Sequence, residues 1–148
     1  MSAIAGVFSR RGAPRHPGEI DQMMAVMASR GPDGTSTWAG DRLTLGHGAL
    51  HATPESVGEQ LPLVDPLTGN VIVADVRLDN RPQLLSLLGL DGWDPSQIGD
   101  GRLLLDSYRH WGEDCVDHLL GDFAFAIWDE RSQQLFLARD HFGAKPLT

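Results

Sequence analysis

The chain has 148 residues and a formal net charge of −8, with 41% hydrophobic and 22% charged residues. These values are typical of a single globular domain, which at this length buries about 70% of its unfolded surface. The acidic balance and the scattered basic residues argue against a nucleic-acid partner, and no apolar run reaches the ~20 residues of a membrane span.

The single cysteine, Cys115, has no second thiol with which to form an internal disulfide. One unpaired cysteine fits a reducing compartment. The N-terminus also lacks the basic segment and apolar run of a signal peptide, so the sequence predicts a cytoplasmic protein. Acidic residues precede Cys115, and no cation lies nearby to lower the pKa of its thiol, so we expect this residue to be buried and structural.

The first third of the chain predicts a strand, a helix and two further strands. Residues 2–9 are small and apolar and predict a buried strand. Pro17 is suited to the first turn of a helix, which we expect to end at Gly31-Pro32. One face of this helix carries four apolar residues at helical spacing, which we interpret as core packing: Ile20, Met23, Met24 and Met27.

Residues 35–39 and 42–51 predict the next two strands. In the second, Leu43, Leu45 and His47 alternate with small or polar residues, the period of a half-buried strand. Residues 52–70 are rich in proline, glycine and acids and predict a loop. The β-branched run 71–76 then predicts a short strand.

The central part of the chain predicts helices. Asn80 is a suitable N-cap for a helix with an apolar face of Leu84, Leu85, Leu87 and Leu88. Residues 89–100 predict a linker. A second helix is expected over 102–111, with Leu104, Leu105, Tyr108 and Trp111 on one side, and Val116, Leu119 and Leu120 suggest a short third helix.

The chain closes with a predicted hairpin of strands 123–128 and 134–138 around a turn at 129–133. Strands therefore fall in antiparallel-looking groups, and helices come in separate blocks. This order predicts an α+β fold rather than a parallel, doubly wound sheet. No internal repeat or domain boundary is evident, so residues 1–148 are expected to form one domain.

Several short motifs, in this order and spacing, resemble the glutaminase domain of the asparagine synthetase B family. They are Gly6-Val7-Phe8, Arg30-Gly31-Pro32-Asp33, Gly46-His47, Asp100, Gly121-Asp122-Phe123-Ala124-Phe125-Ala126 and Arg139-Asp140-His141-Phe142-Gly143. The resemblance implies the fold of N-terminal-nucleophile hydrolases, a four-layer αββα sandwich of antiparallel sheets. Such domains usually continue for several more strands, so we expect this one to be truncated at its C-terminus, with an open sheet edge.

The same resemblance implies the chemistry of a type 2 glutamine amidotransferase. In active members an N-terminal cysteine attacks the glutamine amide, and its own α-amine acts as base. An asparagine side chain and a glycine N–H stabilise the oxyanion, an arginine binds the glutamine carboxylate, and an aspartate binds its ammonium group.

Carried over by position, most of these roles fall on unsuitable residues. The nucleophile becomes Ser2, and the arginine of the family's Gly/Ala-His-x-Arg-Leu segment becomes Ala49. The Asn-Gly-Glu segment aligns with Asp75, Val76 and Arg77, which places a carboxylate where an oxyanion donor is needed. Only the ammonium-binding aspartate is retained, as Asp100. The resemblance therefore predicts a degenerate glutamine pocket without hydrolytic activity.

Family members that have lost the glutaminase reaction include β-lactam synthetases and lasso-peptide cyclases, which adenylate a carboxylate with ATP. The resemblance implies a scaffold domain of such an amide-forming enzyme, in a family centred on asparagine biosynthesis. Its partner would be a C-terminal synthetase domain that binds ATP and Mg²⁺, and its substrate a small amine or peptide. The synthetase domain's Ser-Gly-Gly-x-Asp-Ser segment is absent from these 148 residues.

Two other functions stay open at this point. Ser2 itself serves as an amidohydrolase nucleophile if Met1 is removed, because N-terminal serines do act in this fold class. Alternatively, the domain is a non-catalytic module that binds an amine or peptide through Asp100. His47 and His51 share a strand face, but without a third ligand at useful spacing we expect no metal site.

Overall fold

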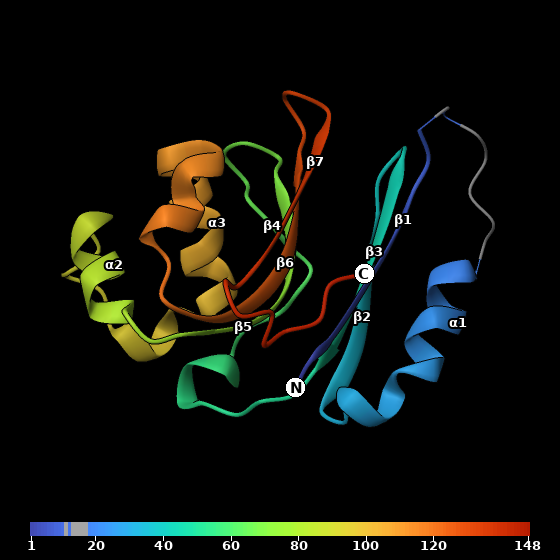
Figure 1. Cartoon of the computed structure of the whole chain (residues 1–148), viewed down its shortest axis with the longest axis horizontal. Coiled ribbons are helices and arrows are strands. Elements are labelled where there is room, and N and C mark those ends of the chain that lie inside the picture. Colours follow the sequence, from blue (N-terminus) through green and yellow to red (C-terminus); the bar gives the residue numbers. More distant parts are fainter. Residues whose placement is uncertain (11, 13–17) are drawn as a thin grey trace.

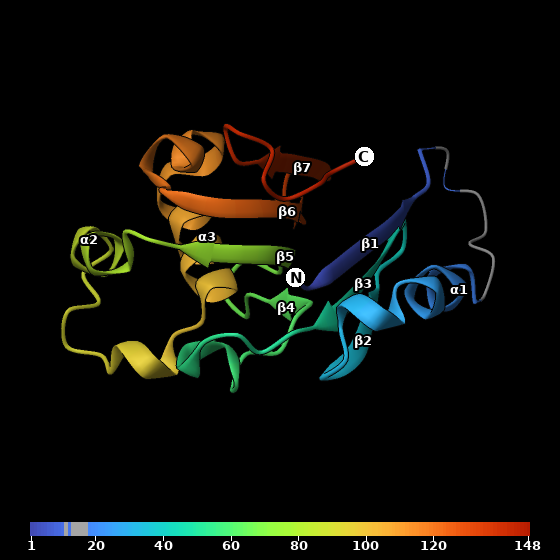
Figure 2. The same cartoon turned by 60° about the horizontal axis from the view of Figure 1, so that its bottom comes forward.

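The computed structural model describes residues 1–10, 12 and 18–148. Figure 1 shows two antiparallel sheets face to face, with one helix outside the first sheet and two helices outside the second. This is the αββα layering expected for an α+β sandwich. The N-terminus lies between the two sheets, close to the C-terminal loop, in both views (Figure 2).

The first sheet has the order β1-β3-β2, with bounds Ala3–Phe8, Leu43–Ala49 and Gly34–Ala39. Helix α1, Glu19–Val26, covers its outer face, and the 3₁₀ turn η1, Ala28–Arg30, leads into β2. Here Gly31 lies against the backbone of Gly48, and a Cβ on Gly31 would overlap it. The glycine in the predicted Gly31-Pro32 turn therefore lets the chain cross close to β3.

The second sheet has the order β4-β5-β6-β7, with bounds Leu63–Val64, Val71–Leu78, Gly121–Asp129 and Gln134–Arg139. Strands β6 and β7 form the hairpin predicted from the sequence, with Asp129 opposite Gln134. Strand β5 contacts β1 and β3 across the interface between the sheets. This central strand carries Asp75.

Helices α2, Arg81–Leu87, and α3, Asp100–Trp111, lie outside the second sheet. Three 3₁₀ segments connect the elements on this side: η2 at Pro54–Ser56, η3 at Pro95–Gln97 and η4 at Gly112–His118. Segments η2 and η3 contact each other near the start of α3.

Hydrophobic clusters among the described residues hold the layers together. The largest joins α2 and α3 to the outer face of the second sheet, and it includes the fully buried Leu104, Cys115 and Phe125. A second cluster, with Leu45 and Val73, fills the space between the sheets. Cys115 is buried, as the sequence predicted, and this burial raises the pKa of its thiol to about 12.

The first predicted helix corresponds to α1, but only some of the residues predicted to pack in the core are buried. Ile20 and Met24 are buried, as predicted, whereas Met23 remains 38% exposed. Met23 instead lines an open apolar cavity between the layers. The prediction that Pro17 begins this helix lies outside the described residues.

The predicted capping role of Asn80 is wrong, although Asn80 does occupy the N-cap position of α2. Its side chain makes no cap hydrogen bond. It donates to the carbonyl of His118 and accepts from the N–H of Leu120, and so connects the start of α2 to the segment between η4 and β6. Leu87, predicted to be on the apolar face of this helix, is 49% exposed.

Other boundaries differ by a few residues. Helix α3 begins at Asp100, two residues earlier than expected, and the predicted linker before it contains η3. The predicted short third helix is the 3₁₀ segment η4, which ends before Leu119. Among the described residues, no helix is both long enough and apolar enough to cross a bilayer.

Candidate functional site

Ser2 lies just before β1, at the edge of the interface between the two sheets. Its backbone N–H donates to Asp75 Oδ1 on β5 over 3.2 Å. Its hydroxyl accepts a hydrogen bond from the Leu50 N–H, also over 3.2 Å. Ser2 is therefore held on both sides, by the second sheet through its main chain and by the end of β3 through its side chain.

Asp75 is 6% exposed and forms an ion pair with Lys145. The Lys145 Nζ lies 3.0 Å from Asp75 Oδ1, the same oxygen that accepts from Ser2. A buried carboxylate needs such partners, because removing it from water is costly. Strand alternation explains the geometry: Asp75 follows Val71 and Val73 on the face of β5 that points toward the first sheet.

Lys145 is positioned by a tight loop after β7. The Asp140 carboxylate accepts backbone hydrogen bonds from Ala144 over 2.8 Å and from Lys145 over 3.0 Å. These bonds, the one from Lys145 first, hold the pKa of Asp140 below its usual value. The loop that begins at Arg139-Asp140-His141 therefore positions the Lys145 amine against the Asp75 carboxylate.

A small cavity opens beside Ser2, with a volume of about 40 Å³. Ala49 and Val76, two positions of the predicted glutamine pocket, line it together with Ser2. The cavity has room for a few water molecules, whereas small-molecule sites usually span ~300–1,000 Å³. The volume of the cavity is well below that range.

His47 also lines this cavity, next to Asp75. Burial lowers its pKa to about 4, against the opposing influence of the Asp75 carboxylate. At neutral pH the imidazole is therefore uncharged, so it does not supply a positive charge for an oxyanion. Among the described residues, no three His, Cys, Asp or Glu side chains lie close enough to hold a metal ion.

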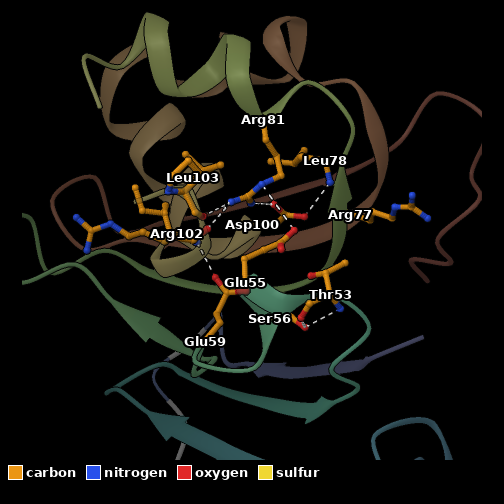
Figure 3. Close-up of polar contacts among 12 residues, drawn as sticks. Thr53, Glu55, Ser56, Glu59, Arg77, Leu78, Arg81, Asp100, Arg102 and Leu103 are labelled. Carbon is orange, nitrogen blue, oxygen red and sulfur yellow. Dashed lines mark hydrogen bonds and ion pairs between the residues drawn. The ribbon is translucent and has the colours of Figure 1, made fainter. Parts of the chain in front are cut away.

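The other two predicted pocket residues lie elsewhere. Arg77 points away into solvent, where its side chain is 73% exposed and lies 4.0 Å from Asp79 (Figure 3). Asp100 is buried at the start of α3 and does not line the Ser2 cavity. The structure thus brings Ser2, Ala49, Asp75 and Val76 together and separates them from the remaining two.

Both carboxylate oxygens of Asp100 are engaged by the chain itself. Oδ2 accepts the Leu78 N–H over 2.9 Å, and Oδ1 pairs with the Arg81 guanidinium. Arg81 also donates to the carbonyls of Pro95 and Ile98, so it joins α2, η3 and α3. Burial raises the pKa of Asp100 despite these bonds.

Glu59 borders the Ser2 cavity on the side nearest α3. Its Oε1 accepts the Arg102 N–H at the beginning of this helix over 2.9 Å. Burial raises the pKa of Glu59 from 4.5 to about 7, outweighing the hydrogen bond from Arg102. The proton therefore binds more tightly in the folded than in the unfolded state.

This pKa shift predicts a pH-dependent stability. The contribution of protonated Glu59 to the free energy of unfolding is fully present below pH 4.5. It is lost as the pH rises through about 7. We expect Glu59→Gln, which keeps an oxygen acceptor but does not ionise, to be more stable than the wild type by about 1–3 kcal/mol above pH ~8 and equal to it near pH ~4. Denaturant unfolding across this range measures the difference, and Glu113→Gln, at an exposed position, is the control.

The whole chain, residues 1–148, matches the family model described as a glutamine amidotransferase domain. The chain belongs to this family. It is 38% identical over 129 residues to asparagine synthetase [glutamine-hydrolyzing] 3 of Bacillus subtilis. It is 31% identical over 165 aligned positions to a putative asparagine synthetase of Mycobacterium tuberculosis, and 29% identical over 148 to asparagine synthetase B of Escherichia coli.

These alignments cover 86%, 99% and 99% of this chain but only 21%, 24% and 26% of the respective relatives. The glutamine amidotransferase domain described here therefore corresponds to a fifth to a quarter of each of those proteins. The match agrees with the fold: two antiparallel sheets with helices on both outer faces.

Three residues at the site of this glutamine amidotransferase domain were missed from the sequence: Glu59, Arg81 and Lys145. A signal for Lys145 was present, because Asp75 interrupts the otherwise apolar run Val71–Val76 and so requires a buried partner. Lys145 is the sole lysine of the chain. For Glu59 and Arg81, which lie in a loop and at a helix start, no local pattern indicated burial.

Proposed function

We propose that this domain has lost glutamine hydrolysis and serves as a structural domain of an ATP-dependent, amide-forming synthetase. The observation that carries the proposal is the Asp75–Lys145 ion pair directly behind Ser2. At the position where an oxyanion donor is needed, the Asp75 side chain has no N–H to donate, and the Lys145 amine is already bound to its carboxylate. Loss of one oxyanion donor alone typically slows catalysis by ~10²–10³-fold.

Two further features support the same proposal. Ala49 has no group that binds a substrate carboxylate, whereas an arginine fork would do so with two hydrogen bonds. Asp100 is already neutralised by Arg81, so it offers little to a substrate ammonium group. In this proposal ATP and Mg²⁺ bind to a separate synthetase portion, which joins a carboxylate to an amine or peptide as in β-lactam synthetases and lasso-peptide cyclases.

The alternative is an active amidohydrolase with Ser2 as the nucleophile. Two observations favour it: the relatives are named as glutamine-hydrolysing, and the Ser2 hydroxyl borders a cavity. This mechanism requires a free α-amine on Ser2 as the base, and therefore removal of Met1. Intact-mass measurement establishes whether the purified protein meets that condition.

We expect no ammonia release from glutamine by the Met1-processed protein, and none by Ser2→Cys. The cysteine restores the nucleophile. It does not replace the Asp75 carboxylate, and it does not restore at Ala49 an arginine that binds the substrate carboxylate. A coupled glutamate assay measures both proteins, with Ser2→Ala as the background. Ammonia release by the wild type above the Ser2→Ala background would disprove the proposal and establish the amidohydrolase.

A further inference from the structure

A cleft of about 410 Å³ lies between η2 and η3, above the start of α3. Its volume falls within the ~300–1,000 Å³ range of small-molecule sites. Apolar side chains form one part of its wall and polar groups another. The lining includes Pro54, Val57, Leu63, Glu59, Ser96 and Gln97.

Glu59 lines this η2–η3 cleft together with two other charged residues, Glu55 and Arg102, and it also borders the smaller cavity beside Ser2. Its carboxylate is seated against the backbone at the beginning of α3, where a Cβ on Gly99 would overlap it. The Arg102 N–H binds Oε1. These contacts fix the Glu59 carboxylate between the η2–η3 cleft and the cavity beside Ser2.

The cations around Glu59 are bound to other carboxylates. Arg81, from α2, pairs with Asp100 and lies 3.7 Å from Glu55. The Arg102 side chain donates to Asp106 over 2.9 Å. Glu59 forms no ion pair within the described part of the chain, and the neighbouring Asp100 adds a second negative charge.

A desolvated carboxylate without a cation is electrostatically unfavourable, and a bound cation relieves that cost. We propose that the η2–η3 cleft binds a small organic cation, a primary amine or guanidinium on a short aliphatic stem, with its charged group against the Glu59 carboxylate. The stem lies along Val57 and Leu63, and Ser96 and Gln97 offer hydrogen bonds at the η3 side. This site is distinct from Asp100, which Arg81 occupies.

The proposal is tested by calorimetric titration of the 148-residue protein with n-butylammonium and agmatine, and with neutral n-butanol as the matched control. We expect saturable millimolar or tighter binding of both cations, and at least about tenfold weaker binding of butanol. Glu59→Gln should lose at least about tenfold in affinity, because it keeps the shape of the cleft but removes the charge. Glu113→Gln, on the exposed η4, should bind as the wild type does.

Proton release gives a second readout that a purely structural role of Glu59 does not produce. At about pH 6.5 Glu59 is partly protonated, so cation binding should displace a fraction of a proton, and above about pH 8.5 almost none. Titrations in buffers of different ionisation enthalpy measure this number. Glu55 and Arg102 also line the cleft, and the charges of Asp100 and Arg81 act on Glu59 from beside it, but only Glu59→Gln should abolish the release.

Three results would overturn the proposal: no cation binding by the wild type, equal binding of butanol, or unchanged affinity in Glu59→Gln. Binding only of peptides with a basic side chain would instead assign the cleft to a protein partner, and it would also reject the small-molecule site. None of these results depends on glutamine hydrolysis, so the proposed loss of that reaction is tested separately.

Discussion

The Asp100→Ala variant is expected to lose about 3–5 kcal/mol of unfolding free energy, because it leaves the Arg81 guanidinium buried without its principal counter-ion. The change also removes the acceptor of the Leu78 N–H at the end of β5. The Pro95 and Ile98 carbonyls still hold the guanidinium in place in this variant. Denaturant unfolding followed by circular dichroism measures the loss.

A double-mutant cycle separates the ion pair from general damage. Arg81→Met should also be strongly destabilising, since it leaves Asp100 and Glu55 without a cation. The double variant Asp100→Ala/Arg81→Met should be more stable than the sum of the two single losses predicts, by at least about 1 kcal/mol. The exposed Asp117→Ala serves as the control. Additive single losses would show that Asp100 and Arg81 do not act as a pair.

The layered fold was predictable from the sequence because its elements depend on local patterns. The hairpin of β6 and β7 and the buried strand β5 follow from β-branched and aromatic runs with turn residues between them. Helix α3 follows from apolar residues at helical spacing. The pairing of the strands into two sheets was reached only through the resemblance to a known family.

The contacts that determine the site were not predictable in this way. Asp75 and Lys145 are separated by 70 positions, and no periodicity links them. Asn80 illustrates a second reason. Its position before the helix predicts a local cap, but its side chain instead forms long-range hydrogen bonds with the backbone of His118 and Leu120. Arg77 shows a third, because it shares the face of β5 with Asp75 but lies near the end of the strand, where this face is open to solvent.

The Lys145→Met variant is expected to lose about 2–4 kcal/mol, whereas Asp75→Asn should lose about 1 kcal/mol or less. Asp75 is buried on a rigid central strand, so without Lys145 its carboxylate has no cation and no route to solvent. Asparagine keeps the oxygen that accepts from Ser2, and the long lysine stem is able to turn its amine into water. Combining Asp75→Asn with Lys145→Met should therefore recover most of the loss caused by Lys145→Met alone.

Lys145 also allows a direct measurement of the closed site, since it is the sole lysine. Reductive methylation should modify its amine slowly in the wild type, where the lysine side chain is 14% exposed, and several-fold faster in Asp75→Asn. Asp122→Asn, at an exposed position of β6, should leave the rate unchanged. Equal methylation rates in all three proteins, together with equal losses for Lys145→Met and Asp75→Asn, would show that the ion pair does not hold Lys145 behind Ser2. The proposed loss of an oxyanion donor would then lose its structural basis, because the Lys145 amine would be free to bind an oxyanion at Ser2.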